Sequence, residues 1–310
     1  MRRWLLLVFL ALTITVITAY AYISFNHEFA FASVANCTQS AAARLIVSKD
    51  NWKHWWPGEQ ANDSIYRYKE LNYKIDKILL YGFEATIFRN KDSAKGFLTV
   101  VPTGNDSARF EFAGKCVYSS NPVTRVLQYF RFGAIRDNIE NFVSETRTYF
   151  NKQQNIYGFN VVEGKVRDSS MISTKETFNH YPDVKEVYEI IDRLRQFVKE
   201  KGGEQVDSPM LNVYADNPGR YQVMVAIPTK SDLPSESGFQ LKKMVLGNIL
   251  IAEVKGGPAT VRLGEENLQN YVDDYHKVSP AIPYQSLVTN RMVEKDTTKW
   301  ITRLYYPVFR

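Results

Sequence analysis

The hydrophobic pattern begins with an uninterrupted apolar run near the amino terminus. No charged side chain lies between Trp4 and Phe25, a stretch rich in Leu, Val, Ala, Ile and aromatic residues. A helix of about 20 such residues crosses the roughly 30 Å hydrocarbon layer of a bilayer. Arg2 and Arg3 precede the run, so the positive-inside rule predicts a cytoplasmic amino terminus and an exported remainder.

This run predicts a cytoplasmic stub and a single transmembrane helix over residues 1–26. The chain would then lie in the cell inner membrane as a single-pass protein, with its soluble domains periplasmic or extracellular. The alternative is a cleaved signal peptide, for which Ala19, Tyr20 and Ala21 supply a small-x-small site. The length of the run favours a retained anchor, and under either alternative the protein leaves the cytoplasm.

Residues 27–152 combine short strand-like segments with one long amphipathic segment. A short strand over 31–37 is followed by a helix for which Ser40 is the expected N-cap. Phe132 to Phe150 carries apolar residues at helical spacing and predicts a long helix. Between them, further strands are expected over residues 64–68, 73–80, 85–89, 96–101 and 108–112.

An aromatic cluster, Asn51 to Gly58, contains three tryptophans and ends in a Pro-Gly turn. This stretch and the order strand, helix, antiparallel strands, long helix resemble the START-like (SRPBCC) helix-grip fold over residues 27–152. The resemblance implies a sheet that wraps the last helix around a cavity for an apolar ligand. The alternative is that Trp52, Trp55 and Trp56 only fill the core.

Residues 153–310 contain a pattern that occurs twice. Strands over 158–166 and 171–177 precede a helix over 183–201 and strands over 210–214 and 221–227. A strand over 248–254 precedes a helix over 259–276, a strand ending at 288 and a last strand over 300–306. The spacing of equivalent positions is near 77 residues and predicts a duplicated strand-helix-strand-strand module. The fold class is therefore α+β.

Two segments of this half, Gly247 to Pro258 and Arg303 to Val308, resemble the GyrI-like domain. The same module is the effector-binding domain of AraC- and MerR-type regulators. A START-like and a GyrI-like domain behind one membrane helix also resemble a group of bacterial proteins from Bacteroidetes. The resemblance implies a central groove, lined by aromatic side chains, that binds small molecules. The candidate ligand-binding residues are Met210, Tyr214, Tyr221, Glu253, Gln285, Trp300, Tyr305 and Tyr306.

Charge near the carboxyl-terminal motif modifies this expectation. Members of the family often carry a buried carboxylate just before the final Leu-Tyr-x-Pro, whereas this chain has Arg303 there. That departure favours an anionic or neutral ligand over a cation. Strand alternation sends Tyr305 and Tyr306 to opposite faces, so only one of them can line the groove. Glu253 is the carboxylate that stays near the motif.

Composition excludes several classes of function. Thirty-nine Lys and Arg residues against 33 Asp and Glu give a net charge of +6, but the charges are interspersed and no nucleic-acid-binding motif is present. Nucleic acid is therefore not an expected partner, and no protein partner is indicated. The four histidines are scattered, so neither a metal site nor a cofactor is expected. Cys37 and Cys116 are either a disulfide or two buried thiols.

The sequence leaves three functions open. No common catalytic signature occurs, which favours a sensor, scavenger or carrier of hydrophobic or amphipathic compounds without a DNA-binding domain. Some GyrI-like relatives hydrolyse reactive electrophiles, and in that case Glu253 would be the general base and Tyr305 the proton donor. A structural envelope protein that binds a protein partner is the third alternative, and a large apolar surface patch would favour it.

Overall fold

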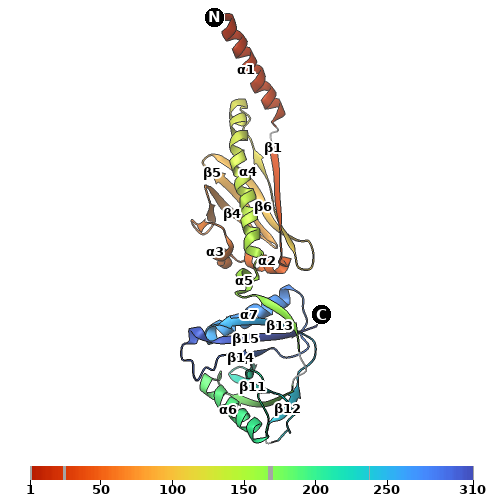
Figure 1. Ribbon diagram of the computed structural model, residues 1–310. Helices are drawn as coiled ribbons and strands as arrows, with labels where there is room; N and C mark the ends of the chain where they lie inside the picture. Colours follow the sequence, from red (N-terminus) through yellow and green to blue (C-terminus); the bar gives the residue numbers. More distant parts are fainter. Residues whose placement is uncertain (1, 24–25, 167–169, 237, 310) are drawn as a thin grey trace. The chain divides into compact units, whose positions relative to one another are not determined.

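The computed structural model describes residues 2–23, 26–166, 170–236 and 238–309. The chain divides into two compact units, residues 1–152 and 153–310. Both units are α+β, and each contains one antiparallel sheet with helices (Figure 1).

The amino-terminal apolar run forms helix α1 (Arg2–Tyr22). Within it, Trp4 to Tyr22 has a mean hydropathy of 2.2, and among the described residues this is the one helix long and apolar enough to cross a bilayer. A signal sequence has the same properties. Ser24 and Phe25, the last two residues of the expected apolar run, lie outside the described residues.

The first unit is a seven-stranded antiparallel sheet with the order β1-β7-β6-β5-β4-β3-β2. Three short helical segments follow the first strand: α2 (Gln39–Ile46), η1 (Lys49–Asn51) and α3 (Trp52–Trp55). The strands are β1 (Asn26–Ala35), β2 (Glu59–Gln60), β3 (Ile65–Tyr68), β4 (Leu71–Leu79), β5 (Gly82–Arg89), β6 (Asp92–Pro102) and β7 (Ala108–Val117).

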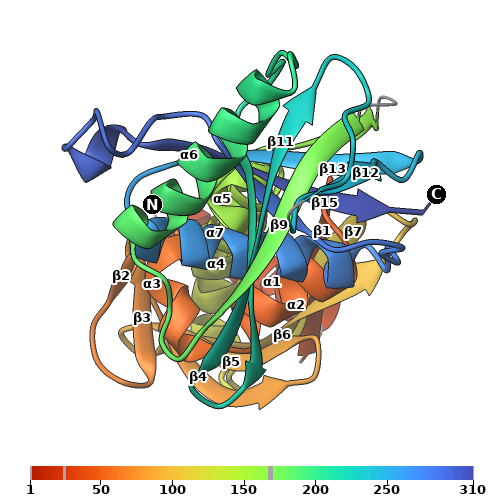
Figure 2. The same cartoon turned by 90° about the horizontal axis from the view of Figure 1, so that it is seen from below.

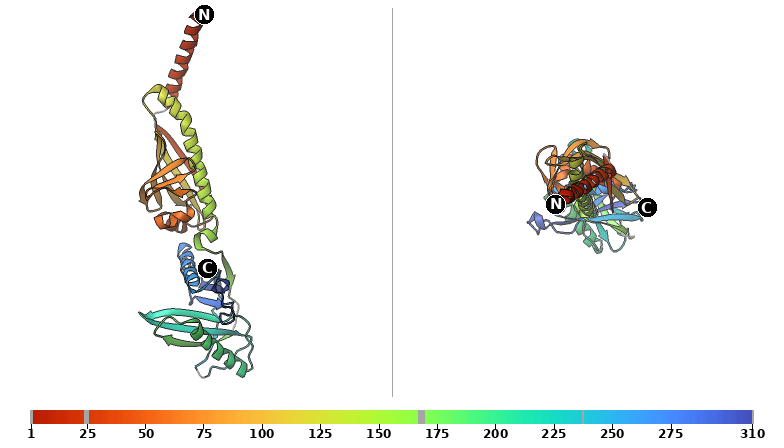
Figure 3. Two further views of the ribbon diagram at one scale, coloured as in Figure 1. Left: turned by 90° about the vertical axis from the view of Figure 1, so that its left-hand side faces the viewer. Right: turned by 90° about the horizontal axis from the view of Figure 1, so that it is seen from above.

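Helix α4 (Pro122–Phe150) packs along one side of this sheet (Figure 3, left). Aromatic rings fill the space between them. The ring centroids of Trp52 and Trp56 are 5.6 Å apart, and that of Trp56 is 4.8 Å from Phe142 on α4. Phe142 and Tyr73 are fully buried. The three tryptophans expected either to line a cavity or to fill the core are therefore packed against other rings of the core.

Several details of the first unit differ from the sequence expectations. Helix α4 begins ten residues before Phe132, because Asn121 caps its first turn and Pro122 fits its first position. Thr38, and not Ser40, caps α2, since its side chain accepts a hydrogen bond from the Ala41 amide. β1 covers residues 26–35 instead of 31–37. Both cysteines are buried, and no disulfide joins them.

The second unit has an eight-stranded sheet with the order β12-β9-β11-β10-β14-β15-β13-β8. Its helices are α5 (Gln153–Tyr157), α6 (Val184–Glu200), α7 (Pro258–Asp274) and the single turn η2 (Thr297–Lys299). Its strands are β8 (Val161–Lys165), β9 (Ser170–Phe178), β10 (Met210–Asn217), β11 (Arg220–Thr229), β12 (Gln240–Lys243), β13 (Asn248–Lys255), β14 (Tyr284–Leu287) and β15 (Ile301–Val308).

The sheet order makes the internal repeat visible. One module is β9-α6-β10-β11 and the other is β13-α7-β14-β15, and their second strands, β10 and β14, pair at the centre of the sheet. β9 lies beside β11 (Figure 2), as β13 lies beside β15. The edge strand β8 lies within the strand expected over residues 158–166, whereas the other edge strand, β12, was not expected. Each pairs with the first strand of the other module.

Helices α6 and α7 cover the same face of the sheet. A row of paired residues, Val225, Leu211, Gln285 and Leu304, crosses four strands on that face. The buried face of α6 packs on the Val225 and Leu211 end of this row. On α7, a Cβ at Gly264 would lie 3.1 Å from the Leu304 side chain, so this helix packs on the other end. The two helices thus flank the pair formed by β10 and β14.

Candidate functional site

A groove lies between the amino-terminal turns of α6 and α7, above the central strands. We call it the inter-helix groove. Its enclosed volume is about 50 Å³. Both repeats contribute to its lining, which consists of Tyr181, Pro182, Asp183, Val184, Val187, Tyr188, Leu211, Val213, Pro258, Val261, Arg262, Glu265, Gln285 and Arg291.

Local sequence orients the two helices that form the walls. Asp183 caps α6 through a capping box with Glu186, in which each side chain accepts a hydrogen bond from the other residue's amide. Pro258 occupies the first turn of α7, where a missing amide hydrogen costs nothing. Val261 and Glu265 are four residues apart on α7 and therefore project from the same side of the helix.

Two carboxylates line the groove, that of Asp183, which caps α6, and that of Glu265. Gln285 on β14, itself 4% exposed, donates a hydrogen bond of 2.9 Å from Nε2 to Glu265 Oε1. Glu265 is open to solvent on one side and surrounded by protein on the others. This partial loss of hydration raises the pKa of the Glu265 carboxyl, against the opposing effects of Gln285 and of the Arg262 and Arg291 guanidinium groups.

Arg291 forms one end of the groove, in the segment between β14 and β15. Its backbone amide donates to the Tyr188 hydroxyl (2.8 Å), and its Nη2 donates to Thr302 Oγ1 (2.8 Å). Its guanidinium carbon lies 5.0 Å from the centroid of the Trp300 ring. Burial lowers the pKa of Arg291, whereas Tyr188, Tyr181 and Glu265 raise it, and an arginine side chain stays charged at neutral pH.

Two tyrosines stand at the mouth of the groove. Tyr181 lies in the loop between β9 and α6 and is 50% exposed. Its ring meets that of Tyr221 edge to face, with centroids 5.5 Å apart. Burial raises the pKa of the Tyr181 hydroxyl, and the nearby Glu265 raises it further. The groove therefore combines aromatic edges, apolar walls, two carboxylates and two guanidinium groups.

Three of the eight residues expected to bind ligand lie in or beside this groove. Gln285 lines it, Tyr221 contacts the lining residue Tyr181, and Trp300 packs against the lining residue Arg291. Tyr306 lies on the helix side of the sheet, where its hydroxyl donates to Gln269 Oε1 at 2.6 Å.

The other four lie on the opposite face of the sheet. Met210 and Tyr214 alternate with the groove residue Leu211 along β10. Tyr305 stacks on Tyr284, with ring centroids 4.9 Å apart. Glu253 is exposed, and its Oε2 accepts a hydrogen bond of 3.1 Å from Arg303 Nε. The structure thus separates Glu253 and Tyr305 from Gln285.

Sequence reasoning did not identify Glu265, Arg291 or Tyr181. Glu265 precedes Glu266 on a helix with many charged residues, and only the packing of α7 shows which of the two enters the groove. A signal was nevertheless available, because Val261 and Glu265 share one side of the expected helix. Among the residues that the structure describes, no group of three or more His, Cys, Asp or Glu side chains is arranged to hold a metal ion.

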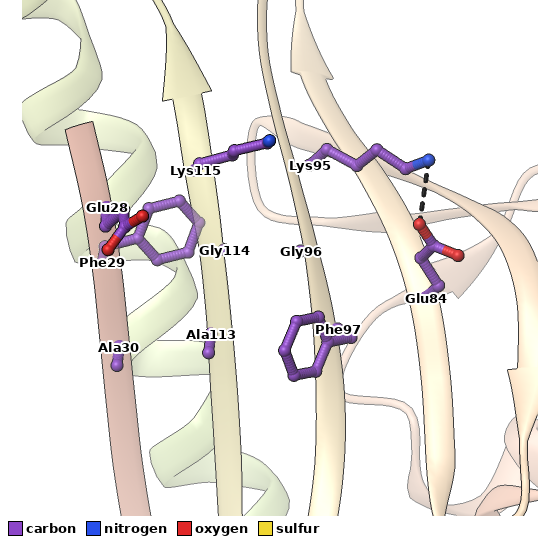
Figure 4. Close-up of a pocket in the computed structure, with 10 residues that line it drawn as sticks. All are labelled: Glu28, Phe29, Ala30, Glu84, Lys95, Gly96, Phe97, Ala113, Gly114 and Lys115. Atoms are coloured by element: carbon purple, nitrogen blue, oxygen red, sulfur yellow. Dashed lines mark ion pairs between the residues drawn. The ribbon is translucent and has the colours of Figure 1, made fainter. Parts of the chain in front are cut away.

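The first unit carries a second depression, on the face of its sheet that points away from α4 (Figure 4). It has a volume of about 590 Å³ and is open to solvent. Its floor is formed by the backbone of Gly96 and Gly114, and Phe29 and Phe97 are its large apolar lining residues. Lys95 at its edge pairs with Glu84 at 2.8 Å. This depression is more open to solvent than the inter-helix groove.

Comparison with known proteins gives similarities of structure alone. No protein-family model matches the chain, and no curated protein matches it. The chain is similar to the EcmrR C-terminal domain, with 14% identity and a TM-score of 0.43, over 49% of this chain and 98% of that one. It is similar to SAV2435 bound to tetraphenylphosphonium, with 15% identity and a TM-score of 0.32, over 48% of this chain and 93% of that one. It is also similar to a hydrolase from Listeria innocua, with 11% identity and a TM-score of 0.38, over 48% of this chain and 91% of that one.

Proposed function

We propose that the second unit is a GyrI-like domain that binds hydrophobic or amphipathic small molecules in the inter-helix groove. The observation that carries the proposal is the pairing of Glu265 with the buried amide of Gln285 between walls supplied by both repeats. A carboxylate with a raised pKa in a cleft is typical of sites that bind or react. The chain would act as a sensor, scavenger or carrier.

The groove must open before it takes a ligand. Its volume of about 50 Å³ is far below the roughly 300 Å³ at which ligand pockets begin. Tyr181 and Pro182 close it from a loop without helix or strand structure, and Tyr181 is half exposed. We infer that an entering ligand displaces the Tyr181 ring and takes its place against the apolar wall formed by Val187 and Val261.

Charge selects the ligand. Two guanidinium groups, those of Arg262 and Arg291, share the groove with the carboxylates of Glu265 and Asp183, and the Asp183 carboxylate already accepts the capping hydrogen bond of α6. A neutral polar group can donate to Glu265 and accept from an arginine, and an anion gains from both arginines. A cation meets two like charges. The groove therefore suits neutral or anionic amphipathic compounds better than cationic ones.

Three naphthalene compounds with one aromatic body and different head groups test this directly: 2-naphthalenemethanol, 2-naphthoate and 2-naphthylmethylammonium. The full chain in lipid nanodiscs is titrated with each, and amide hydrogen exchange maps the protected segments. We expect saturable binding of the neutral and anionic compounds, with protection over residues 181–188, 258–265 and 285–291. Absence of saturable binding, or protection confined to other segments, would contradict the proposal.

The membrane topology is also proposed. Besides the apolar α1, the first turns of α4 expose Val123, Leu127 and Phe130 on one side of the helix. Arg125, between them, donates from Nη2 to the Tyr20 hydroxyl near the end of α1 (3.2 Å). Apolar side chains beside a membrane helix suit the interfacial layer. A reporter enzyme fused after residue 310 should be active outside the cytoplasm; activity only inside would overturn the topology.

For the first unit we propose the helix-grip arrangement of the START-like family over residues 27–152, with residues 153–310 as the binding domain. The sheet that holds α4 supports the assignment. Because rings of Trp56, Phe142 and their neighbours fill the space beneath α4, we place ligand binding in the second unit. Naphthalene compounds should therefore leave the amide hydrogen exchange of residues 27–152 unchanged; saturable protection of segments in that range would restore a ligand site to the first unit.

A second candidate function is hydrolysis of reactive electrophiles. The raised pKa of Glu265 favours it, because a more basic carboxylate removes a proton from water more readily. Water would add to an epoxide, Glu265 would take the water proton, and the Tyr181 hydroxyl would protonate the departing oxygen. Incubation with styrene oxide separates the two functions: a diol formed by the wild type and lost in Glu265→Gln supports hydrolysis, and unchanged epoxide supports binding alone.

A further inference from the structure

The face of the eight-stranded sheet that points away from α6 and α7 carries an apolar region where β9, β10 and β11 lie side by side. Antiparallel sheets with one covered face commonly carry polar residues on the other. Here a row of paired residues with small side chains, Ser173, Ala226 and Ser286, crosses the sheet together with Met210. The small side chains leave room above the strands, and larger apolar side chains surround that room.

Methionines form most of this surrounding wall. Four of the six methionines in the chain, Met171, Met210, Met224 and Met244, line one pocket of about 280 Å³. We call it the methionine pocket. Met171 is 7% exposed. A second space of about 580 Å³ adjoins it and shares Met210, Met244 and Tyr284 as lining residues. The combined space reaches the size of ordinary ligand pockets.

The charges at the rim are positive. Lys242 on β12 pairs across the sheet with Met171 and reaches into the pocket, where its Nζ lies 3.6 Å from Met224 Sδ. The neighbouring Lys243 forms an ion pair of 3.1 Å with Asp232. Among the described residues that line the methionine pocket, none is acidic, and the adjoining space adds Lys165, Arg303 and one acidic residue, Asp207. A thioether is a weak acceptor for an ammonium group, so Lys242 would gain from a carboxylate or sulfonate in its place.

We propose that the methionine pocket is a second ligand site, distinct from the inter-helix groove, and that it binds single-chain amphiphiles with an anionic head group. The alkyl chain lies among the four methionines, whose unbranched, polarisable side chains adapt to apolar shapes. The head group accepts a hydrogen bond from Lys242 Nζ. Gln285 and Glu265 lie on the other face of the sheet and take no part.

Octanoate is a suitable probe because it is soluble in water and carries one alkyl chain and one carboxylate. The full chain is labelled with methyl-¹³C methionine, placed in nanodiscs and titrated while its methyl signals are recorded. We expect saturable shifts of Met171, Met210, Met224 and Met244. Met292, which lies outside the pocket and is 42% exposed, is the internal reference and should stay in place.

Two controls test the role of charge. Lys242→Gln should raise the dissociation constant of octanoate about tenfold, equivalent to about 1.4 kcal/mol, and leave that of octan-1-ol unchanged, which also shows that the pocket is intact. Lys230→Gln, whose side chain pairs with Glu204 and does not line the pocket, should change both constants less than twofold. The proposal is overturned if the four methyl signals do not move, if Met292 moves in parallel with them, or if octylammonium binds as tightly as octanoate.

Discussion

Replacing Tyr188 by Phe removes the hydroxyl that holds one end of the inter-helix groove in place. That hydroxyl accepts a hydrogen bond from the Arg291 amide (2.8 Å) and donates one to the Thr289 carbonyl (3.3 Å), and so ties α6 to the segment that carries Arg291. Tyr188 is 3% exposed, so water has little access to the unpaired groups. At about 1 kcal/mol for each hydrogen bond, the substitution should destabilise the second unit by about 2 kcal/mol. For a unit of this size the melting temperature should fall by roughly 4–8 °C.

Hydrogen exchange measured by mass spectrometry reads this effect where it arises. Peptides that contain residues 288–293 should exchange at least tenfold faster in Tyr188→Phe, since a loss of about 1.4 kcal/mol corresponds to a factor of ten. Peptides from the sheet of the first unit should not change. Tyr221→Phe is the matched control, because the Tyr221 hydroxyl has no hydrogen-bond partner among the described residues. Equal exchange in wild type and Tyr188→Phe would refute the idea that Tyr188 positions the Arg291 segment.

Three further outcomes follow from the structure. Phe142→Ala should destabilise the first unit by about 3–5 kcal/mol, because the fully buried Phe142 ring packs against Trp56 and Tyr73. A loss of unfolding free energy below about 1 kcal/mol in a denaturant titration would show that the core is loosely packed. Burial raises the pKa of the Cys116 thiol to about 12, so iodoacetamide at pH 8 should label it only after unfolding, and rapid labelling of the native protein would contradict its burial. Because burial raises the pKa of Glu265 above its unfolded value, the stability associated with this group is complete at low pH and is lost as the pH rises through the folded pKa. Glu265→Gln should therefore be more stable than the wild type at pH 8 and equal to it near pH 4, and the opposite trend in thermal melts would exclude the raised pKa.

Much of the fold follows from periodicity. Helical spacing placed α6 and α7 within two residues of their ends, and the recurrence of one pattern predicted the two modules of the second sheet. Short edge elements were harder to predict. β12 has only four residues and takes its place by pairing with β9, a partner about 70 residues earlier in the chain. Such a strand has little signal of its own, because its hydrogen-bond partners stabilise it.

The candidate site was harder to predict than the fold, because strand register decides which face a side chain occupies. Tyr284 and Gln285 are neighbours in sequence, yet one lies on the methionine-lined face and the other lies in the groove. A shift of one residue exchanges the two faces. Glu253 was selected for its proximity to a motif, whereas the groove carboxylate, Glu265, depends on how α7 rotates over the sheet. Neither the rotation of a helix nor the pairing of distant strands can be read from local pattern.

The central claim is that Glu265 in the inter-helix groove contacts the bound small molecule. The most direct test is the dissociation constant of 2-naphthalenemethanol and of 2-naphthoate for the wild type, Glu265→Gln and Glu266→Gln in nanodiscs. A hydrogen bond to a charged group contributes about 1.5–3 kcal/mol. Glu265→Gln should therefore raise the dissociation constant of 2-naphthalenemethanol by about tenfold or more. The same change removes a negative charge from the groove and should lower the dissociation constant of 2-naphthoate. The control variant, Glu266→Gln, should alter neither. If Glu265→Gln shifts both compounds in the same direction, or neither of them, the groove is not the binding site.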